Sequence, residues 1–430
     1  MDFFRTNIIE SFNFLSGSFL ISSFDLAYNL SKIVDFVNKN LTQHHHRVAY
    51  IATAIAAEYG LNLSRIKNTT LAALLHDIGL MVTSEVKNLS TFDIGDDGKL
   101  SHSKIGSYLL KEVSFFQELS DIIEKHHFKY KDYPDIEDEP LIIFLADRID
   151  ILLDRNKASY YQKDKICDII SSESGKMFKP EHVEAFLKFK DKEYFWLELD
   201  MPDKDKILRK YIQYDIYDLN IENIMEFTKF IGQLIDFRCS FTATHSVRVA
   251  NTAATLSKYC GFDEQKQKEV EVAGYLHDIG KLGIDPYIIN KNGPLTIDEM
   301  AEMRKHTYYT YYILTSLEIF DDLKYMAAFH HEYLDGTGYP FHLKANRLTT
   351  GCRLMTIADI FTALTEDRPY RKGMKIDKTL SILETFAKNG KIDCNILDIL
   401  KENIDEIQYI SKSLHNEVIA KYNNFKNVLI

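Results

Sequence analysis

Histidine and aspartate residues form two ordered sets in this chain of 430 residues, and both residue types are common ligands of divalent metal ions. The second half of the chain contains His245, His277, Asp278, His306, His330, His331 and Asp359. The first half contains His44, His76, Asp77, His102, His126, His127 and Asp147. In both sets the first two histidines are 32 residues apart, and the third and fourth are 24 apart. A lone histidine is more often a core or surface residue, but ten of the 15 histidines in two matched sets predict metal binding.

Seven ligands are too many for one tetrahedral ion, and they suit two ions that share a bridging carboxylate. His277 and Asp278 are adjacent and can serve neighbouring ions, with Asp278 as the bridge. Imidazole and carboxylate ligands without thiolate fit iron, manganese or zinc. Two divalent ions with two carboxylates and a hydroxide keep a small positive charge, which attracts a phosphate ester and favours in-line attack by water. The set therefore predicts metal-assisted phosphoester hydrolysis, and the absence of a GxxxxGK[ST] motif leaves a P-loop NTPase unsupported.

The elements that must position these ligands are predicted to be helices. The segments HHHRVAYIATAIAAEYG (44–60) and HSVRVANTAATLSKYCG (245–261) align at an offset of 201 residues. Their apolar positions recur at steps of three and four, which places them on one helical face, and a glycine ends each segment. The repeat predicts an all-α fold of two related tandem domains, at 25–200 and 215–430, with an N-terminal extension at 1–24 and a junction at 201–214.

Composition narrows the classes of partner and location. A net charge of −11 argues against a nucleic-acid polymer, because such binders need a basic face. Five scattered cysteines without a CxxC motif favour reduced thiols and a cytoplasmic location. The N-terminus lacks the basic region and cleavage site of a signal peptide, and no apolar run reaches the roughly 18 residues of a spanning helix. We expect no membrane association, whereas a homodimer and signalling partner proteins stay open.

The second half closely resembles the HD-GYP family of HD-domain metallohydrolases, over about 230–385. The resemblance rests on HSVRVA, YLHDIGKLGI, KHTYYTYYIL, FHHEYLDGTGYP and ADIFTALTEDRPYR. It implies an all-α HD fold with two or three metal ions, usually iron or manganese. It also implies hydrolysis of cyclic dinucleotides, chiefly cyclic di-GMP and in some members 3′,3′-cGAMP.

The resemblance also implies roles for single residues. The seven histidines and aspartates of the second half fall on the family's metal ligands, with Asp278 as the bridge and Asp359 helping to position the nucleophile. Lys281 falls on the lysine that approaches the scissile phosphate. The residues that border the substrate are Gly338, Tyr339, Arg368 and Arg371, although Tyr339 can instead be structural. Members with a third ion carry a glutamate where this chain has Phe241, so we expect two ions here.

The first half resembles a plain HD domain that keeps all seven ligand types. It has Leu80 where the second half has Lys281, and HHFKYKDYP where the second half has HHEYLDGTGYP. Leucine cannot pair with a phosphate. We therefore expect a metal-binding regulatory or structural module rather than a second catalytic site, the alternative being a decayed site without metal.

Three functions compete for the whole chain. The leading hypothesis is a metal-dependent cyclic-dinucleotide phosphodiesterase whose second half carries out the reaction. An HD-type nucleotide phosphohydrolase with another substrate is a second hypothesis, against which HHEYLDGTGYP argues. A cyclic-dinucleotide receptor without turnover is the third, against which the complete ligand set and Lys281 argue.

Overall fold

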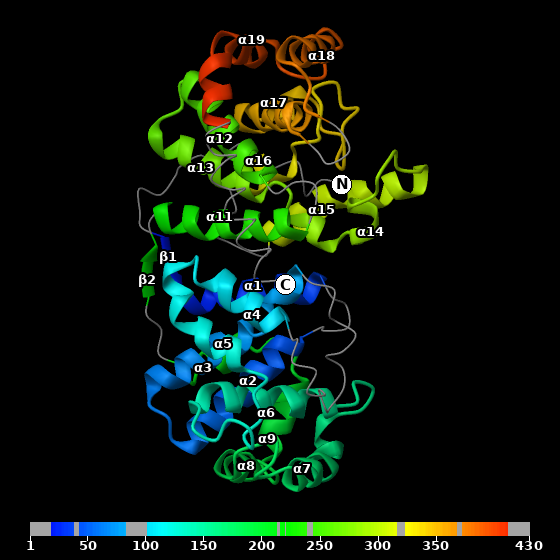
Figure 1. Ribbon diagram of the computed structural model, residues 1–430. Coiled ribbons are helices and arrows are strands. Elements are labelled where there is room, and N and C mark those ends of the chain that lie inside the picture. The colour runs from blue at the N-terminus through cyan, green and yellow to red at the C-terminus, as the bar shows by residue number, and fades with distance from the viewer. Residues whose placement is uncertain are drawn as a thin grey trace.

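The computed structural model describes residues 19–37, 43–82, 101–212, 216–219, 221–238, 244–315, 323–367 and 372–411. Within these ranges almost all regular structure is helical, which confirms the predicted all-α class. The described strands are β1 (Phe19–Ser22) and β2 (Ile216–Leu219), which pair with each other. Figure 1 shows two helical halves stacked one above the other, with the two strands at one side of the junction between them.

The first half contains ten α-helices in its described residues. They are α1 (Ser23–Val37), α2 (His44–Tyr59), α3 (Leu63–Leu75), α4 (Ser101–Leu110), α5 (Ser120–Lys125), α6 (Asp138–Leu152), α7 (Lys163–Ser172), α8 (Pro180–Leu187), α9 (Glu193–Asp200) and α10 (Asp205–Leu208). Three short 3₁₀ helices accompany them: η2 (Ile78–Met81), η4 (Ser114–Leu119) and η5 (Ser159–Gln162).

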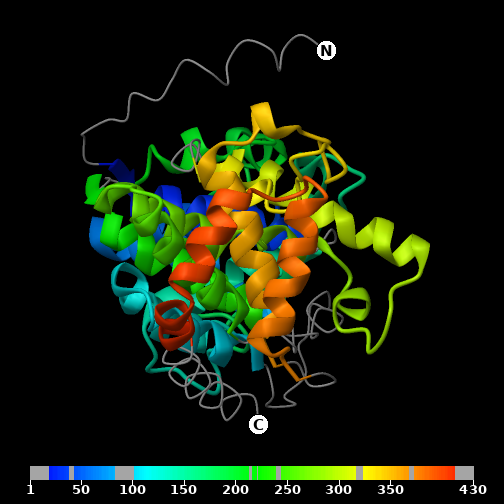
Figure 2. The same cartoon turned by 90° about the horizontal axis from the view of Figure 1, so that it is seen from above.

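The second half repeats the beginning of this order. Its described α-helices are α11 (Ile221–Arg238), α12 (His245–Tyr259), α13 (Glu264–Leu276), α14 (Pro286–Ile289), α15 (Ile297–Thr315), α16 (Leu323–Ala328), α17 (Thr350–Thr365), α18 (Ile376–Lys388) and α19 (Cys394–Glu402). The 3₁₀ helices are η6 (Ile279–Gly283) and η8 (Ala345–Arg347). Seen from above, α14 and α15 extend outward from the rest of the half (Figure 2).

Matched capping residues fix the same helical elbow in both halves. Gly60 (φ 96°) and Gly261 (φ 83°) end α2 and α12 in the left-handed conformation that glycine adopts without strain. The next helices begin at equivalent N-caps, where Asn62 accepts from the backbone N–H of Arg65 and Asp263 from that of Lys266. The elbow folds α3 back on α2 and α13 back on α12, so the histidine that starts one helix lies beside the histidine that follows the next helix.

The two halves meet through their equivalent first elements. β1 pairs with β2 in antiparallel register, from Phe19 opposite Leu219 to Ser22 opposite Ile216. α1 of the first half packs against η6 of the second. The rings of Phe115 and Phe227, one from each half, lie 6.2 Å apart. One continuous cluster of buried apolar residues therefore includes side chains of both halves.

No helix among the described residues is long and apolar enough to cross a lipid bilayer. The cysteines in the described ranges are Cys167, Cys260, Cys352 and Cys394, and all four are free thiols.

Candidate metal centres

All seven predicted ligands of the second half lie together at one centre. His245 begins α12, and His277 and Asp278 follow the last residue of α13. His306 lies within α15, the pair His330 and His331 follows α16, and Asp359 lies within α17. The centre therefore forms where the ends of three helices meet the sides of two others.

These side chains divide into two groups around Asp278. His245, His277 and Asp359 form one group, and His306, His330 and His331 form the other; the ligand atoms of each group lie within 4.8 Å of one another. Oδ2 of Asp278 lies 3.1 Å from Nε2 of His277, whereas its Oδ1 lies 3.5 Å from Nε2 of His306. One carboxylate oxygen thus faces each group, which is the geometry that a carboxylate bridging two ions needs.

Backbone carbonyl groups orient the histidine rings towards the centre. Nδ1 of His277 lies 2.8 Å from the carbonyl oxygen of Gly274. Nδ1 of His306 lies 2.6 Å from the carbonyl oxygen of Met303, and Nδ1 of His330 lies 2.7 Å from that of Ala327. An Nδ1–H that donates to each carbonyl leaves Nε2 as the lone-pair nitrogen. Nε2 of His277 is buried without a hydrogen-bond partner among the described residues, and an orphaned buried acceptor of this kind fits a metal ligand.

Glu366 stands behind His245. Its Oε2 lies 3.2 Å from Nδ1 of His245, and its Oε1 accepts a hydrogen bond of 2.8 Å from the Thr244 hydroxyl. Burial works to lower the pKa of His245, but the carboxylates of Asp359 and Glu366 outweigh it and raise that pKa to about 10. A carboxylate in this position fixes the ring and increases its strength as a ligand. Glu366 was not predicted from the sequence, in which it is the acidic residue directly before DRPYR.

The open side of this centre carries the residues expected to meet substrate. The side chain of His331 is 27% exposed, whereas that of Asp278 is 4% exposed. The Tyr339 ring packs on the His331 ring at 4.9 Å, and the Arg304 guanidinium lies 5.0 Å above the Tyr339 ring. Lys281 contacts Asp278. Arg304 was not predicted, because no spacing rule links it to the ligands.

Gly338 lies against the backbone that follows the histidine pair. A Cβ atom at this position would lie 2.4 Å from the backbone nitrogen of Tyr333, so no larger residue fits without a shift. The carboxylate of Glu332 accepts from the backbone N–H groups of Phe341 and Leu343, at 2.7 and 2.9 Å, and so holds the two sides of the loop together. Three predicted positions, Arg368, Arg371 and Phe241, lie outside the described residues.

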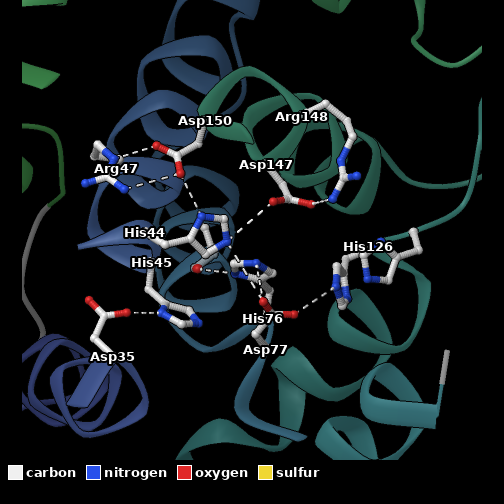
Figure 3. Close-up of polar contacts among 12 residues, drawn as sticks. Asp35, His44, His45, Arg47, His76, Asp77, His126, Asp147, Arg148 and Asp150 are labelled. Atoms are coloured by element: carbon white, nitrogen blue, oxygen red, sulfur yellow. Dashed lines mark hydrogen bonds and ion pairs between the residues drawn. The ribbon is translucent and has the colours of Figure 1, made fainter. Parts of the chain in front are cut away.

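The first half builds the same centre around Asp77. Oδ2 of Asp77 lies 3.4 Å from Nε2 of His76 and 3.9 Å from Nε2 of His44, whereas Oδ1 lies 3.3 Å from Nε2 of His102. Two groups of side chains have ligand atoms within 4.8 Å of one another. One contains His44, His76 and Asp77, and the other contains Asp77, His102, His126 and His127. Figure 3 shows the side chains of His44, His76 and His126 converging on Asp77. Nε2 of His76 is again buried without a hydrogen-bond partner among the described residues.

The residues around the first centre differ from those around the second. Asp150 replaces Glu366 behind the first histidine: its Oδ2 lies 2.7 Å from Nδ1 of His44, and its Oδ1 accepts from Arg47 at 2.6 Å (Figure 3). Leu80 is buried at the position of Lys281, with 4% exposure. Arg148 is fully buried and contacts Asp147.

Comparison with known families gives both halves the same class. A model of the HD domain matches residues 229–396, and a second HD-domain model matches residues 41–152. The chain therefore contains two HD domains in tandem.

Among its homologues is the 3′3′-cGAMP-specific phosphodiesterase 1 of Vibrio cholerae, which is 26% identical over 89% of this chain and 92% of that protein. The 3′3′-cGAMP-specific phosphodiesterase 3 of V. cholerae is 40% identical over 36% of this chain and 33% of its own length. The cyclic di-GMP phosphodiesterase response regulator RpfG of Xanthomonas campestris is 31% identical over 42% and 48%. The chain thus spans nearly all of the first relative but half or less of the other two.

A solved structure shows the same fold. The crystal structure of a cyclic GMP-AMP-specific phosphodiesterase of V. cholerae superposes with a TM-score of 0.59, covering 89% of this chain and 98% of that chain at 21% identity. At this identity the likeness concerns the fold alone.

Proposed function

We propose that this protein is a metal-dependent phosphodiesterase that hydrolyses cyclic dinucleotides in its second half. The observation that carries the proposal is Asp278, whose two oxygens face histidines of two different ligand groups, His277 in one and His306 in the other. The homologues named as 3′3′-cGAMP-specific and cyclic di-GMP phosphodiesterases support this substrate class. Cyclic di-GMP and 3′,3′-cGAMP are the substrates that we propose.

We further propose two ions in this centre, iron or manganese, because the ligands are imidazoles and carboxylates without thiolate. When bound, such a pair lowers the pKa of water towards about 7 and neutralises the phosphoryl oxygens. Asp278 holds the two ligand groups at a fixed separation, and Glu366 keeps Nε2 of His245 turned inward. Asp359 completes the ligand group of His245 and helps to position the nucleophile.

Substrate binding is assigned to the open side of the centre. Lys281 places an ammonium beside Asp278, where it approaches the phosphate that is cleaved. Tyr339 and Gly338 border the substrate, and Arg368 and Arg371 supply guanidinium forks that match phosphate oxygens.

For the first half we propose a regulatory or structural role. Leu80 offers no charge to a phosphate, and the Gly-rich loop of the second half has no counterpart in HHFKYKDYP. We also propose the domain boundaries given above, with the first domain at 25–200 and the second at 215–430. The N-terminal extension is then 1–24 and the junction is 201–214.

The test is turnover by full-length protein, purified without oxygen and loaded with iron or manganese. Cyclic di-GMP and 3′,3′-cGAMP are offered separately, and products are resolved by chromatography. Linear dinucleotide or mononucleotide products support the proposal, and the two rates name the preferred substrate. Tight binding without product, with metal content verified, would favour a receptor, and turnover of other nucleotides alone would favour a different phosphohydrolase.

A further inference from the structure

Arg148 is a buried cation at the first metal centre, and among the described residues of the second half the equivalent position carries no cation. The residue directly follows Asp147 in α6, has 0% exposure, and contacts the Asp147 carboxylate. Its guanidinium lies 5.7 Å above the Phe144 ring. In the second half the residue after Asp359 is Ile360, which is apolar and packs against the core.

Arg148 engages one of the two carboxylate oxygens of Asp147. Oδ1 of Asp147 lies 3.4 Å from Nε2 of His44, while Oδ2 faces Arg148. In the second half Oδ1 of Asp359 lies 3.3 Å from Nε2 of His245, and its Oδ2 faces Nδ1 of His331 at 3.9 Å. Figure 3 shows Asp147 between His44 and Arg148.

The consequence appears in the ligand groups. Asp359 belongs to a close group with His245 and His277, but among the described residues Asp147 belongs to none. The close group of His44 and His76 therefore has Asp77 as its carboxylate, whereas Asp147 lies near His44 without joining that group, and Asp77 is shared with the other group.

The other group is complete. Asp77, His102, His126 and His127 form a four-residue group with all ligand atoms within 4.8 Å of one another. Nε2 of His102 lies 3.3 Å from Oδ1 of Asp77 and 2.8 Å from Nε2 of His127, and Nε2 of His126 lies 3.8 Å from Oδ1 of Asp77. Bonds of about 2.1 Å at tetrahedral angles separate ligand atoms by roughly 3.4 Å, so the distances of 3.3 and 3.8 Å to Asp77 suit one tetrahedral ion. His102 and His127, at 2.8 Å, would separate slightly on binding it.

We propose that the first half is a one-ion site of the zinc type, ligated by Asp77, His102, His126 and His127, in which the Arg148 guanidinium replaces the second ion. The fixed positive charge neutralises Asp147 and keeps it from completing a ligand group with His44 and His76. The inference rests on the proposed metal binding of the first half and does not depend on turnover by the second.

The test counts ions per chain. Full-length protein is stripped with a chelator, equilibrated with zinc(II), freed of excess metal, and analysed by mass spectrometry for bound zinc. Arg148→Met frees Asp147, so we expect one ion more than in the unchanged protein. Arg148→Lys keeps a buried cation and should keep the original count.

The reciprocal change is Ile360→Arg, which places a guanidinium beside Asp359 and should remove one ion from the second half. Arg65→Met is the matched control, because it removes another arginine that pairs with α6, at Glu139, away from the centre. It should leave the count unchanged. Circular dichroism checks that each variant is folded.

An unchanged ion count in folded Arg148→Met would overturn the inference, as would an equal gain in Arg148→Lys. If Arg148→Met does not fold, Arg148→Lys and Ile360→Arg decide. An Ile360→Arg variant with the same ion count as the unchanged protein overturns the inference, and one with one ion fewer supports it. Because the measure is a difference in ions, it stays readable even if no cyclic dinucleotide is hydrolysed.

Discussion

At the scale of single residues, the two centres differ most in the cation that contacts a ligand aspartate. In the second half it is Lys281, which is partly exposed and contacts Asp278. In the first half the equivalent residue is the buried Leu80, and the nearby cation is Arg148, which has no exposed surface. A mobile ammonium at an open site can move to a substrate phosphate, whereas a buried guanidinium that is held by a carboxylate cannot.

Replacing Lys281 by leucine copies the first half into the second. We expect Lys281→Leu to keep its metal but to slow hydrolysis by at least about tenfold, because a charge that stabilises the transition state is lost. Lys305→Leu is a suitable control, since Lys305 is exposed and pairs with Glu302. Metal content and turnover are measured on the same samples, and equal rates for Lys281→Leu and the unchanged protein would refute the argument.

Glu366 gives a second prediction for single residues. Glu366→Gln keeps the size of the side chain but removes the charge behind His245, so that imidazole becomes a weaker ligand. We expect metal affinity to fall by about tenfold or more, measured by competition with a chelator. Glu384→Gln, at a solvent-exposed pair with Lys401, should leave the affinity unchanged. An unchanged affinity for Glu366→Gln would mean that the carboxylate only fills space.

The buried His182, which lies away from the metal ligands, should make the first half less stable to unfolding at acid pH. Burial lowers the pKa of His182 to about 4, although Asp138 opposes the shift. Between pH 6.5 and 4 the unfolded chain then binds a proton that the folded chain does not, so stability is lost as the pH falls. The loss amounts to about 3 kcal/mol at most. We expect His182→Gln to flatten the pH dependence of the unfolding free energy in this window, and an unchanged slope would contradict the assignment.

The ligand residues could be predicted from the sequence because their spacing repeats at one offset. The carboxylates behind the first histidines could not, since Asp150 follows its ligand aspartate by three residues and Glu366 follows by seven. Asp150 lies in α6 with its ligand aspartate, whereas Glu366 follows the last residue of α17, so no common spacing indicates which acid meets the imidazole. Arg148 was missed for a related reason: one changed letter beside an aspartate has no meaning until its burial is known.

At the scale of elements, the glycine shared by HDIGK and HDIGL has a packing role. A Cβ atom at Gly280 would lie 1.9 Å from the carbonyl oxygen of His306, and one at Gly79 would lie 2.0 Å from that of His102. The 3₁₀ turns η6 and η2 therefore press directly on the helices that carry the third histidine. This close approach sets the distance between the bridging aspartate and that histidine.

Gly280→Ala should push η6 away from α15. Because the Cβ atom would meet backbone rather than a flexible side chain, we expect loss of metal from the second centre and loss of most turnover. Gly79→Ala is the matched change in the first half, and it should cost metal there while the second centre keeps its ions. Metal counts distinguish the two outcomes, and full metal retention in Gly280→Ala would show that the turn can shift without harm.

The prediction of helices from periodicity was confirmed for α2 and α12, including the glycines that end them. The strands β1 and β2 were not predicted. Each has four residues, and its partner lies about 200 residues away, so no local pattern could indicate the pairing.

At the scale of the whole molecule, the shared core predicts that the halves unfold together. Phe227 is 5% exposed and lies against Phe115 of the other half. Phe227→Ala should lower the unfolding free energy by about 3 kcal/mol or more, in one transition that includes both halves. Tyr161→Ala, at a side chain with 86% exposure, should change it by less than about 0.5 kcal/mol. Two separate transitions in denaturant, followed by circular dichroism, would contradict a common core.

The antiparallel pairing of β1 with β2 brings together equivalent elements of the two halves, as the interface of a symmetric homodimer does. In a homodimer one gene encodes both subunits, so every substitution appears twice. A buried arginine beside one ligand aspartate would then arise beside the other as well, and both sites would gain or lose ions together. Joining the two copies in a single chain removes that constraint. The first half can therefore carry Leu80 and Arg148. The second half can keep Lys281 and Ile360 at the equivalent positions. The two halves pack as the subunits of a dimer do, yet their sequences can differ.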